Sequence, residues 1–338
     1  MRVLQIVPQL PPPFEGVGTY AAALAGALGG ETRFLVGDPA WTGAENGARA
    51  VAARTAADLL AGIGDLGGIG ETGAVLLHYA NYGYQARGCP AWLVEGMKRW
   101  SGRLVTVFHE VCAAGPPWQS SFWLRPAQRR LAAVLTRRSD ALATTLDVYA
   151  GLLRPWAGGR EIAVLPVFST VGEPAAVPPF GERARRIVVF GGAGVRGRAY
   201  GPFLPALARA AQALAAEEIL DVGPPLPLPG RAGNVPIRPL GVLAAGEVSA
   251  ILLAAAAGFL AYPPDFLPKS TIFAAYCAHG TLPVCAWNRA GEPSLDGAPI
   301  PLWRGEGDPA PFAAAAHGWY GGHSLRSQAG RFRSLLAP

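Results

Sequence analysis

Cysteine is scarce in this chain of 338 residues, and no two cysteines are close together in the sequence. The four that occur are Cys89, Cys112, Cys277 and Cys285. They form no CxxC pair and show no His/Cys spacing of a metal site, so the sequence indicates neither a zinc site nor a disulfide scaffold. This cysteine usage favours a reducing, cytoplasmic setting.

Long apolar runs are missing as well. No stretch of about eighteen uninterrupted apolar residues occurs, which argues against a membrane-spanning helix. The opening MRVLQIVP enters a strand pattern at once, without the basic region, apolar core and cleavage site of a signal peptide. We therefore expect a cytoplasmic protein that is either soluble or peripheral at the inner face of a membrane.

Charged residues make up only 15% of the chain, whereas 51% of its residues are apolar. This length and composition can bury two cores, so two domains are expected. The net charge of +6 comes mostly from scattered arginines. A nucleic-acid-binding protein would concentrate such charge on one element, so we expect no nucleic-acid partner. The charge suits an anionic substrate or a peripheral contact with a membrane surface.

Short apolar or β-branched runs alternate with longer stretches of helical character. The strands expected in the first half are 3–7, 33–36, 74–79, 104–109, 141–145 and 162–167. A segment rich in Pro, Gly and Glu, 169–182, then interrupts the pattern and is the expected linker. The strands expected in the second half are 186–191, 219–222, 236–240, 258–262 and 282–286. The helices expected there are 202–215, 244–255, one from 270, 311–317 and 323–336.

This alternation predicts an α/β protein with two Rossmann-like, doubly wound parallel sheets. We expect a first domain over 1–168, completed by a C-terminal helix at 323–338, and a second domain over 183–322. Ligands of such sheets bind outside the carboxyl ends of the strands, so two facing sheets predict a central cleft.

A glycine pair opens the first predicted helix of the chain. Gly16, Val17 and Gly18 follow the first strand after the turn 8–14, where backbone amides can approach an anionic ligand. A plain glycine turn explains them equally well. The motif lacks the third glycine of a dinucleotide fingerprint, so a nucleotide-dependent oxidoreductase is a distant alternative.

Two further groups of polar residues follow first-domain strands. His109 ends the strand 104–109 and is followed by Glu110. These two residues are the catalytic candidates, because an imidazole at this edge can act on a substrate. A histidine there can also satisfy a loop carbonyl. His78 and Tyr82 are candidates for an acceptor pocket, since tyrosines combine an apolar face with a polar tip. Packing explains this second group slightly better.

The second half carries two candidate phosphate-binding segments. Arg196 and Arg198 lie in a glycine-rich stretch directly after a strand, where backbone amides and guanidinium groups suit a diphosphate. A flexible basic surface loop is the alternative. Lys269, Ser270 and Thr271 stand where a helix opens after a Pro-broken loop, which suits a phosphate, although an ordinary helix cap remains open.

The order of these segments resembles the retaining GT-B glycosyltransferases of glycosyltransferase family 4. The resemblance covers nearly the whole chain and rests on the glycine loop after the first strand, 106–109, 162–166, the basic segment after 190, Leu240–Leu243 with Glu247, and HGTLPV at 279–284. It implies the GT-B fold and a nucleotide sugar as the donor substrate, with no cofactor and no metal.

The resemblance also implies roles for particular residues. Gly16, Val17, Gly18, Arg196, Arg198, Lys269, Ser270 and Thr271 would bind the donor diphosphate. Leu243 and Glu247 would bind the nucleotide, and His109 would lie near the transferred sugar. The implied reaction is transfer, with retention, to a saccharide, lipid-linked or small-molecule acceptor, as in polysaccharide biosynthesis. The sequence indicates no oligomeric state.

The chain departs from the family pattern at two places. Family members carry two glutamates eight positions apart around the helix start near 270, and these positions hold Leu267 and Ala275 here. The position of an early arginine of the basic segment holds Ala193, and Arg196 is the alternative residue for that role. The alternative function is therefore a non-catalytic GT-B protein that binds a sugar nucleotide or a protein partner.

Overall fold

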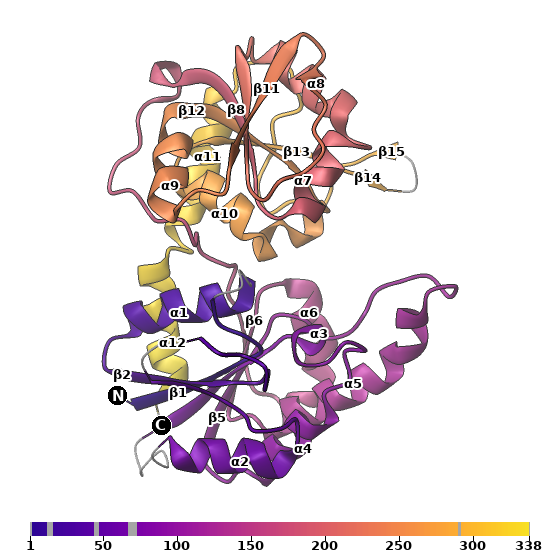
Figure 1. The fold of residues 1–338 in the computed structure, drawn as a ribbon, viewed down its shortest axis with the longest axis vertical. Helices are drawn as coiled ribbons and strands as arrows, with labels where there is room; N and C mark the ends of the chain where they lie inside the picture. The colour runs from indigo at the N-terminus through magenta and orange to yellow at the C-terminus, as the bar shows by residue number, and fades with distance from the viewer. Residues whose placement is uncertain (1, 12–15, 44–46, 67–72, 290–291, 338) are drawn as a thin grey trace. The chain divides into compact units, whose positions relative to one another are not determined.

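The computed structural model describes residues 2–11, 16–43, 47–66, 73–289 and 292–337. Part of the predicted turn 8–14, at 12–14, lies outside them. The chain divides into two compact units, Met1–Pro166 with Gln328–Pro338, and Val167–Ser327. The predicted linker 169–182 therefore falls within the second unit. We describe each unit by itself (Figure 1).

The first unit contains a seven-stranded sheet in the order β3-β2-β1-β4-β5-β6-β7, and every described pair is parallel. Its strands are β1 (Arg2–Val7), β2 (Glu31–Val36), β3 (Ala48–Ala50), β4 (Ala74–Tyr79), β5 (Arg103–Phe108), β6 (Ala141–Thr144) and β7 (Ile162–Val164). The central strands β1 and β4 are almost wholly buried, as expected for apolar runs that helices cover on both faces.

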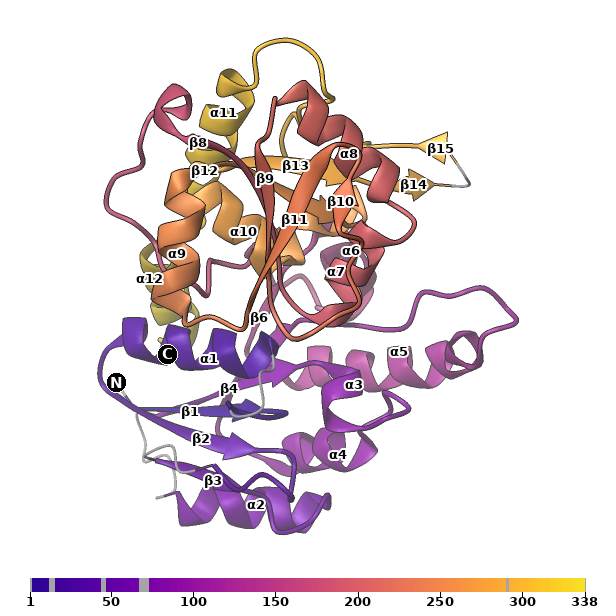
Figure 2. The same ribbon diagram turned by 45° about the horizontal axis from the view of Figure 1, so that its top comes forward.

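Helices cover both faces of this sheet. They are α1 (Gly16–Leu28), α2 (Ala56–Asp65), α3 (Asn81–Tyr84), α4 (Ala91–Arg99), α5 (Ser120–Arg138), α6 (Asp147–Leu153) and most of α12 (Leu325–Leu336). Figure 2 shows α1 on one face and α2 and α4 on the other. The last residues of α12 belong to this unit, because Phe332 is fully buried and Arg103 donates a 2.9 Å hydrogen bond to the carbonyl of Leu335.

The second unit contains a six-stranded sheet in the order β10-β11-β9-β8-β12-β13. Its strands are β8 (Ala184–Phe190), β9 (Glu218–Val222), β10 (Arg231–Ala232), β11 (Val235–Gly241), β12 (Ala255–Ala261) and β13 (Leu282–Ala286). The sequence predicted only parallel pairs. The short edge strand β10 instead pairs antiparallel with β11 across a tight turn, so this sheet is mixed.

Side chains of β8 and β12 alternate between two helical layers. Ile187 and Val189 pack in a core cluster with Leu207 of α8 (Leu204–Ala213). On the opposite face, α10 (Thr271–Ala278) inserts Tyr276, whose hydroxyl donates a 2.9 Å hydrogen bond to the carbonyl of Val188. The remaining helices of this unit are α7 (Ala193–Tyr200), α9 (Ala245–Ala254) and α11 (Ala310–Gly321). This two-layer covering is what a doubly wound sheet requires.

The basic segment after β8 corrects one expectation. The sequence predicted a glycine-rich loop, and the structure shows a helix, α7, with both Arg196 and Arg198 on it. Glycine is unfavourable in a helix by roughly 0.5–1 kcal/mol relative to alanine. Arg196 of this helix makes a buried ion pair with Asp221, described below.

Candidate functional site

Three polar side chains form a buried hydrogen-bonded chain in the first unit. Gln5 of β1, His78 of β4 and His109 directly after β5 project from neighbouring strands toward the same face. The amide oxygen of Gln5 lies 2.7 Å from Nε2 of His78, and Nδ1 of His78 lies 3.1 Å from Nε2 of His109. His109 is 5% exposed, whereas Gln5 and His78 are fully buried. This series of hydrogen-bonded side chains therefore runs from the interior of the sheet to its carboxyl edge.

The hydrogen-bond partners of Gln5, His78 and His109 determine which ring nitrogens of the two histidines carry protons. Gln5 uses its amide N–H to donate to the carbonyl of Ala21 at 3.3 Å, which leaves its oxygen as the acceptor from His78. His78 then donates from Nε2 and accepts at Nδ1, so His109 donates from its own Nε2. Burial lowers the pKa of His78 from 6.5 to about 3, which keeps this imidazole neutral at physiological pH.

An aromatic side chain of α1 closes over both histidines. The Tyr20 ring meets the His109 ring edge-on at 5.3 Å between centroids, and it meets the His78 ring at 5.9 Å. Burial raises the pKa of Tyr20 well above its ordinary value, so its hydroxyl stays protonated. The position of His109 is therefore fixed both by a hydrogen bond and by ring packing.

The acceptor role predicted for His78 does not fit this geometry. Both ring nitrogens are hydrogen-bonded, and none of the side chain reaches solvent. Tyr82 lies in the short helix α3 and is 39% exposed, and its hydroxyl accepts a 3.1 Å hydrogen bond from Gln128. Glu110, beside His109, is half-buried. Of the two acceptor-side candidates, only Tyr82 presents a surface to a ligand.

The glycine pair of α1 divides into two roles. A Cβ added at Gly18 would lie 2.2 Å from the carbonyl oxygen of Gln9, so this glycine lets the helix pack against the β1–α1 turn. A Cβ at Gly16 would meet nothing within 4 Å, and Gly16 is exposed. Val17 between them is half-buried. Packing thus explains Gly18, while Gly16 keeps an open backbone at the helix start.

In the second unit, Arg196 is not exposed to a ligand. Its guanidinium forms a two-point ion pair with Asp221 of β9, at 2.8 and 2.5 Å, and donates a 2.7 Å hydrogen bond to the carbonyl of Pro224. The residue is 1% exposed. A Cβ at Gly223 would lie 2.5 Å from the same guanidinium. Arg196 therefore holds α7 to the loop after β9, in place of the diphosphate contact predicted for it.

Arg198 is the arginine of α7 that a ligand can reach. It is half-buried, its Nε donates a 3.2 Å hydrogen bond to the carbonyl of Ala261 at the end of β12, and its guanidinium lies 5.9 Å from the ring centroid of Tyr262. Among the described residues, no hydrogen bond or ion pair engages its two Nη groups. Arg198 therefore combines a fixed stem with unused donors at the carboxyl edge of the sheet.

The structure brings the two predicted phosphate segments together. Gly191, after β8, has a φ of +122°, and a Cβ there would lie 2.5 Å from Cδ1 of Ile272 in the first turn of α10. Gly191, at the end of β8 and just before α7, thus lies directly against the first turn of α10. Ser270 caps α10 by accepting a 3.2 Å hydrogen bond from the N–H of Phe273. Lys269 and Thr271 flank this cap and are half-buried.

The residues predicted to contact the nucleotide lie after β11. Leu243 is half-buried, and Glu247 in the first turn of α9 accepts a 2.8 Å hydrogen bond from the N–H of Ala244. The N–H of Gly223 bonds to the carbonyl of Gly241 at 2.8 Å, which places the ends of β9 and β11 side by side. Glu247 thus stabilises its own helix start and remains exposed there.

Two apolar residues stand where the resembling family has glutamates. Leu267 and Ala275 are 0% and 1% exposed, and they are part of the packing around α10. The described residues contain no group of three or more His, Cys, Asp or Glu that could hold a metal ion. Metal-independent transfer stays a prediction from the sequence.

Gln5, Tyr20 and Asp221 were not singled out from the sequence. Gln5 and Asp221 were nevertheless detectable, because each interrupts an otherwise apolar strand, LQIV and ILDV. A polar side chain in a buried strand needs a hydrogen-bonded partner. Tyr20 gave no such signal, since an aromatic residue on a helix is ordinary packing.

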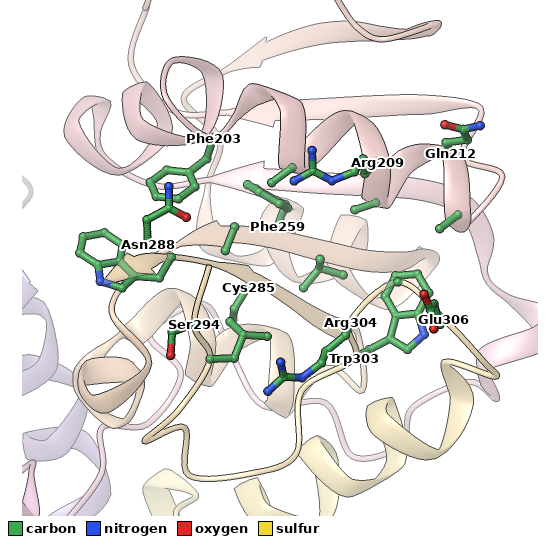
Figure 3. Close-up of a pocket in the computed structure, with 18 residues that line it drawn as sticks. Phe203, Arg209, Gln212, Phe259, Cys285, Asn288, Ser294, Trp303, Arg304 and Glu306 are labelled. Atoms are coloured by element: carbon green, nitrogen blue, oxygen red, sulfur yellow. The ribbon is translucent and has the colours of Figure 1, made fainter. Parts of the chain in front are cut away.

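A cavity of about 630 Å³ lies elsewhere in the second unit (Figure 3). One wall is α8, and the opposite side is formed by β13 and the segment that follows it. Phe203 and Trp287 stack at 5.8 Å between ring centroids at its rim. Arg209 and Arg304 are exposed beside it. None of the predicted donor residues lines this cavity, so we do not assign the donor to it.

Comparison with solved structures shows the fold of the whole chain. An α-glucosyltransferase in complex with UDP and a 13-mer DNA is similar with a TM-score of 0.59 and 12% identity, over 99% of this chain and 98% of that one. A trehalose-6-phosphate protein from E. coli, bound with UDP-2-fluoro glucose, is similar with a TM-score of 0.60, 12% identity and the same coverage. The chain thus has the two-domain α/β GT-B fold.

Sequence comparison adds nothing to this result. No protein-family model matches the chain. No curated protein sequence matches it either. The likeness is therefore one of fold, and the assignment to family 4 stays a prediction.

Proposed function

We propose that this protein is a glycosyltransferase that takes its sugar from a nucleotide-activated donor. The observation that carries the proposal is the near full-length match to two GT-B proteins whose structures hold UDP or a UDP-sugar. The side chains support it, since in each unit polar groups lie at the carboxyl ends of the parallel strands, where ligands of such sheets bind. Membership of glycosyltransferase family 4 and retention of configuration belong to this proposal.

The donor diphosphate is assigned to the second unit. Arg198 supplies the charge, and the start of α10 with Lys269 and Thr271 lies beside the segment that leads into α7. In transfer, the bond from the anomeric carbon to the diphosphate oxygen breaks, a bond to an acceptor hydroxyl oxygen forms, and the hydroxyl proton passes to the leaving diphosphate. Arg198 then stabilises the charge that collects on the leaving diphosphate. Arg196 contributes only by holding α7 in place.

The first unit is assigned the reacting sugar and the acceptor. His109 contacts the sugar, and the neutral His78 orients it through a hydrogen bond that does not change protonation near neutral pH. Gln5 and His78 are therefore positioning residues rather than catalytic ones. Tyr82 supplies an exposed ring and hydroxyl on the acceptor side. The acceptor is a saccharide, a lipid-linked saccharide or a small molecule.

Nucleotide binding tests the donor assignment. The purified protein is titrated calorimetrically with UDP, ADP and GDP, their glucose conjugates, and the corresponding nucleosides. We expect one nucleoside diphosphate series to bind, and Arg198→Ala to weaken it by at least tenfold while nucleoside binding is unchanged. Arg209→Ala removes an exposed arginine of the same unit and is the matched control. Equal affinities for wild type and Arg198→Ala would refute the assignment.

Transfer tests the role of His109. In His109→Ala we expect donor affinity to remain and hydrolysis or transfer of the donor sugar to fall by at least 100-fold. Donor turnover is followed by release of the nucleoside diphosphate. Unchanged turnover in this variant would remove His109 from the reaction.

A non-catalytic protein that binds a sugar nucleotide is the second candidate. Leu267 and Ala275 favour it, because both are buried and apolar where the resembling enzymes have carboxylates. This candidate predicts donor binding that depends on Arg198 but no turnover with any acceptor. The two functions are thus separated by the same two measurements.

A further inference from the structure

We propose that the start of α5 is a membrane-binding surface that recognises anionic phospholipids. Trp118 and Trp123 are 83% and 71% exposed. Side chains of this size are normally buried at least in part, because each carries roughly 200 Å² of surface. Two such indoles five residues apart form an exposed apolar patch, which marks an interaction site. We call Trp118, Trp123, Arg129 and Arg130 the tryptophan–arginine surface.

The structure holds the indole of Trp123 in place. Nε1 of Trp123 donates a 2.9 Å hydrogen bond to the carbonyl of Pro117, and the ring meets Phe122 edge-on at 5.4 Å between centroids. The segment is anchored at its base, where the side-chain oxygen of the buried Gln128 accepts a 2.7 Å hydrogen bond from the N–H of Ala113. Figures 1 and 2 show this segment extending outward from the end of α5. The exposure thus results from a folded turn.

The charge around the indoles has one sign. From Val111 to Ser139 the chain carries five arginines and no aspartate or glutamate. Arg129 and Arg130 are exposed, and the Arg129 guanidinium lies 5.7 Å from the ring centroid of Trp156. At the far end of the helix Arg138 lies within 3.5 Å of Asp140, and Arg137 is exposed. Exposed basic charge therefore extends along α5 from the tryptophans toward its last turn.

An anionic bilayer surface matches this combination. Tryptophan favours the interface between headgroups and acyl chains, and each basic residue near an anionic membrane contributes about 1 kcal/mol. The segment before Trp118, VCAAGPP, carries no charged side chain, and Gln119, Ser120 and Ser121 follow Trp118. Exposed indoles beside basic residues favour the bilayer interface, and binding to single-stranded DNA is the competing outcome that the experiment below measures. Among the described residues no helix is long and apolar enough to cross a bilayer, so the contact is peripheral.

The tryptophan–arginine surface is distinct from the predicted acceptor pocket. Around the acceptor candidate Tyr82, the neighbouring tyrosines Tyr79 and Tyr84 are 0% and 1% exposed. They are core residues of the first unit. Trp118 and Trp123 are more exposed than Tyr82 and lie at α5, whose Gln128 donates a hydrogen bond to the Tyr82 hydroxyl. The proposal does not depend on the donor chemistry proposed above.

Vesicle co-sedimentation of the full chain tests the proposal. The probes are vesicles of phosphatidylcholine alone and vesicles with about one third phosphatidylglycerol, each at low and at physiological salt. We expect binding only with phosphatidylglycerol and weaker binding at higher salt. Trp118→Ala with Trp123→Ala, and separately Arg129→Gln with Arg130→Gln, should each reduce binding at least tenfold. Val242→Ala, which alters a 72% exposed residue of the second unit, is the control.

Thermal unfolding and fluorescence quenching distinguish a variant that no longer binds membranes from one that no longer folds. Each variant should keep the thermal transition of the wild type, because the altered side chains are exposed. Quenching of Trp118 and Trp123 fluorescence by brominated lipids should be strong in the wild type and weak in the tryptophan variant. Absence of vesicle binding by the wild type, binding that both variants retain, or binding of single-stranded DNA in preference to vesicles would each overturn the proposal.

Discussion

The two units bury polar groups near the carboxyl edge of their sheets in opposite ways. The first unit uses a neutral chain, Gln5, His78 and His109, whereas the second uses the ion pair of Arg196 and Asp221. A neutral chain can orient an imidazole without fixing its charge. A buried ion pair is suited to holding loops, because its removal is costly at either partner. The neutral groups of the first unit can therefore take part in chemistry, whereas the ion pair of the second unit holds the scaffold together.

Breaking the ion pair of Arg196 and Asp221 should cause the largest loss in the free energy of unfolding. Arg196→Met leaves the carboxylate of Asp221 buried without a counterion, and we expect the free energy of unfolding to fall by about 3–5 kcal/mol. Arg196→Met combined with Asp221→Leu should recover most of this loss. Urea unfolding measures both variants, with Arg209→Met as the exposed control. A loss below about 1 kcal/mol in the single variant would show that the pair does not hold α7.

Lowering the pH should reduce the free energy of unfolding of wild type more than that of a variant without His78. The pKa of His78 is 6.5 when unperturbed and about 3 in the folded protein, so its stabilising contribution is complete above pH 6.5 and is lost as the pH falls toward 3. Over that interval wild type should lose up to about 1.4 kcal/mol per pH unit more than His78→Gln. Urea unfolding between pH 7.5 and 4 compares the slopes. Parallel slopes for the two proteins would contradict the buried, neutral state.

Removing the acceptor at the inner end of the chain should have a smaller effect. Gln5→Leu leaves Nε2–H of His78 without its partner, and we expect a loss of about 1–3 kcal/mol in the free energy of unfolding. Nitrogen-15 NMR of the imidazoles should report a change of the His78 tautomer or orientation. Gln212→Leu, at an exposed residue, is the control. An unaltered imidazole spectrum in Gln5→Leu would show that Gln5 does not set the tautomer.

The cap of α10 should give the smallest effect. Ser270→Ala removes the hydrogen bond to the N–H of Phe273, and we expect a loss of about 1 kcal/mol. Thr271→Ala, at the neighbouring hydroxyl, should change stability by less than about 0.5 kcal/mol. Thermal unfolding of both variants at one pH checks the difference. Equal losses would mean that Ser270 is not the residue that caps the helix.

The sequence predicted most strands of both sheets, because buried parallel strands are short apolar runs, but it missed the three-residue edge strand β3. The bounds of β4 and β13 agree with the prediction, Ala74–Tyr79 and Leu282–Ala286. The helix α7 was missed because its glycines indicate a loop, and the interaction that stabilises it joins residues 25 positions apart. The antiparallel β10 has only two residues and gives no periodic signal.

The site was predicted less completely, for a related reason. The placement of His109 at a strand end followed from one strand pattern. Its pairing with His78 and Gln5 depends on the order β1-β4-β5 and on the register between these strands, which no single strand shows. The separate roles of Arg196 and Arg198 likewise depend on Asp221, which lies on another strand.

The return of α12 to the first unit has a consequence for synthesis. Arg103 bonds to the carbonyl of Leu335, and Gln328 bonds to that of Pro166, so the first unit closes around the last residues of the helix. During translation the second unit, Val167–Ser327, therefore emerges whole from the ribosome before the first unit has received its final element. The part of the chain that is made first is the last to be completed.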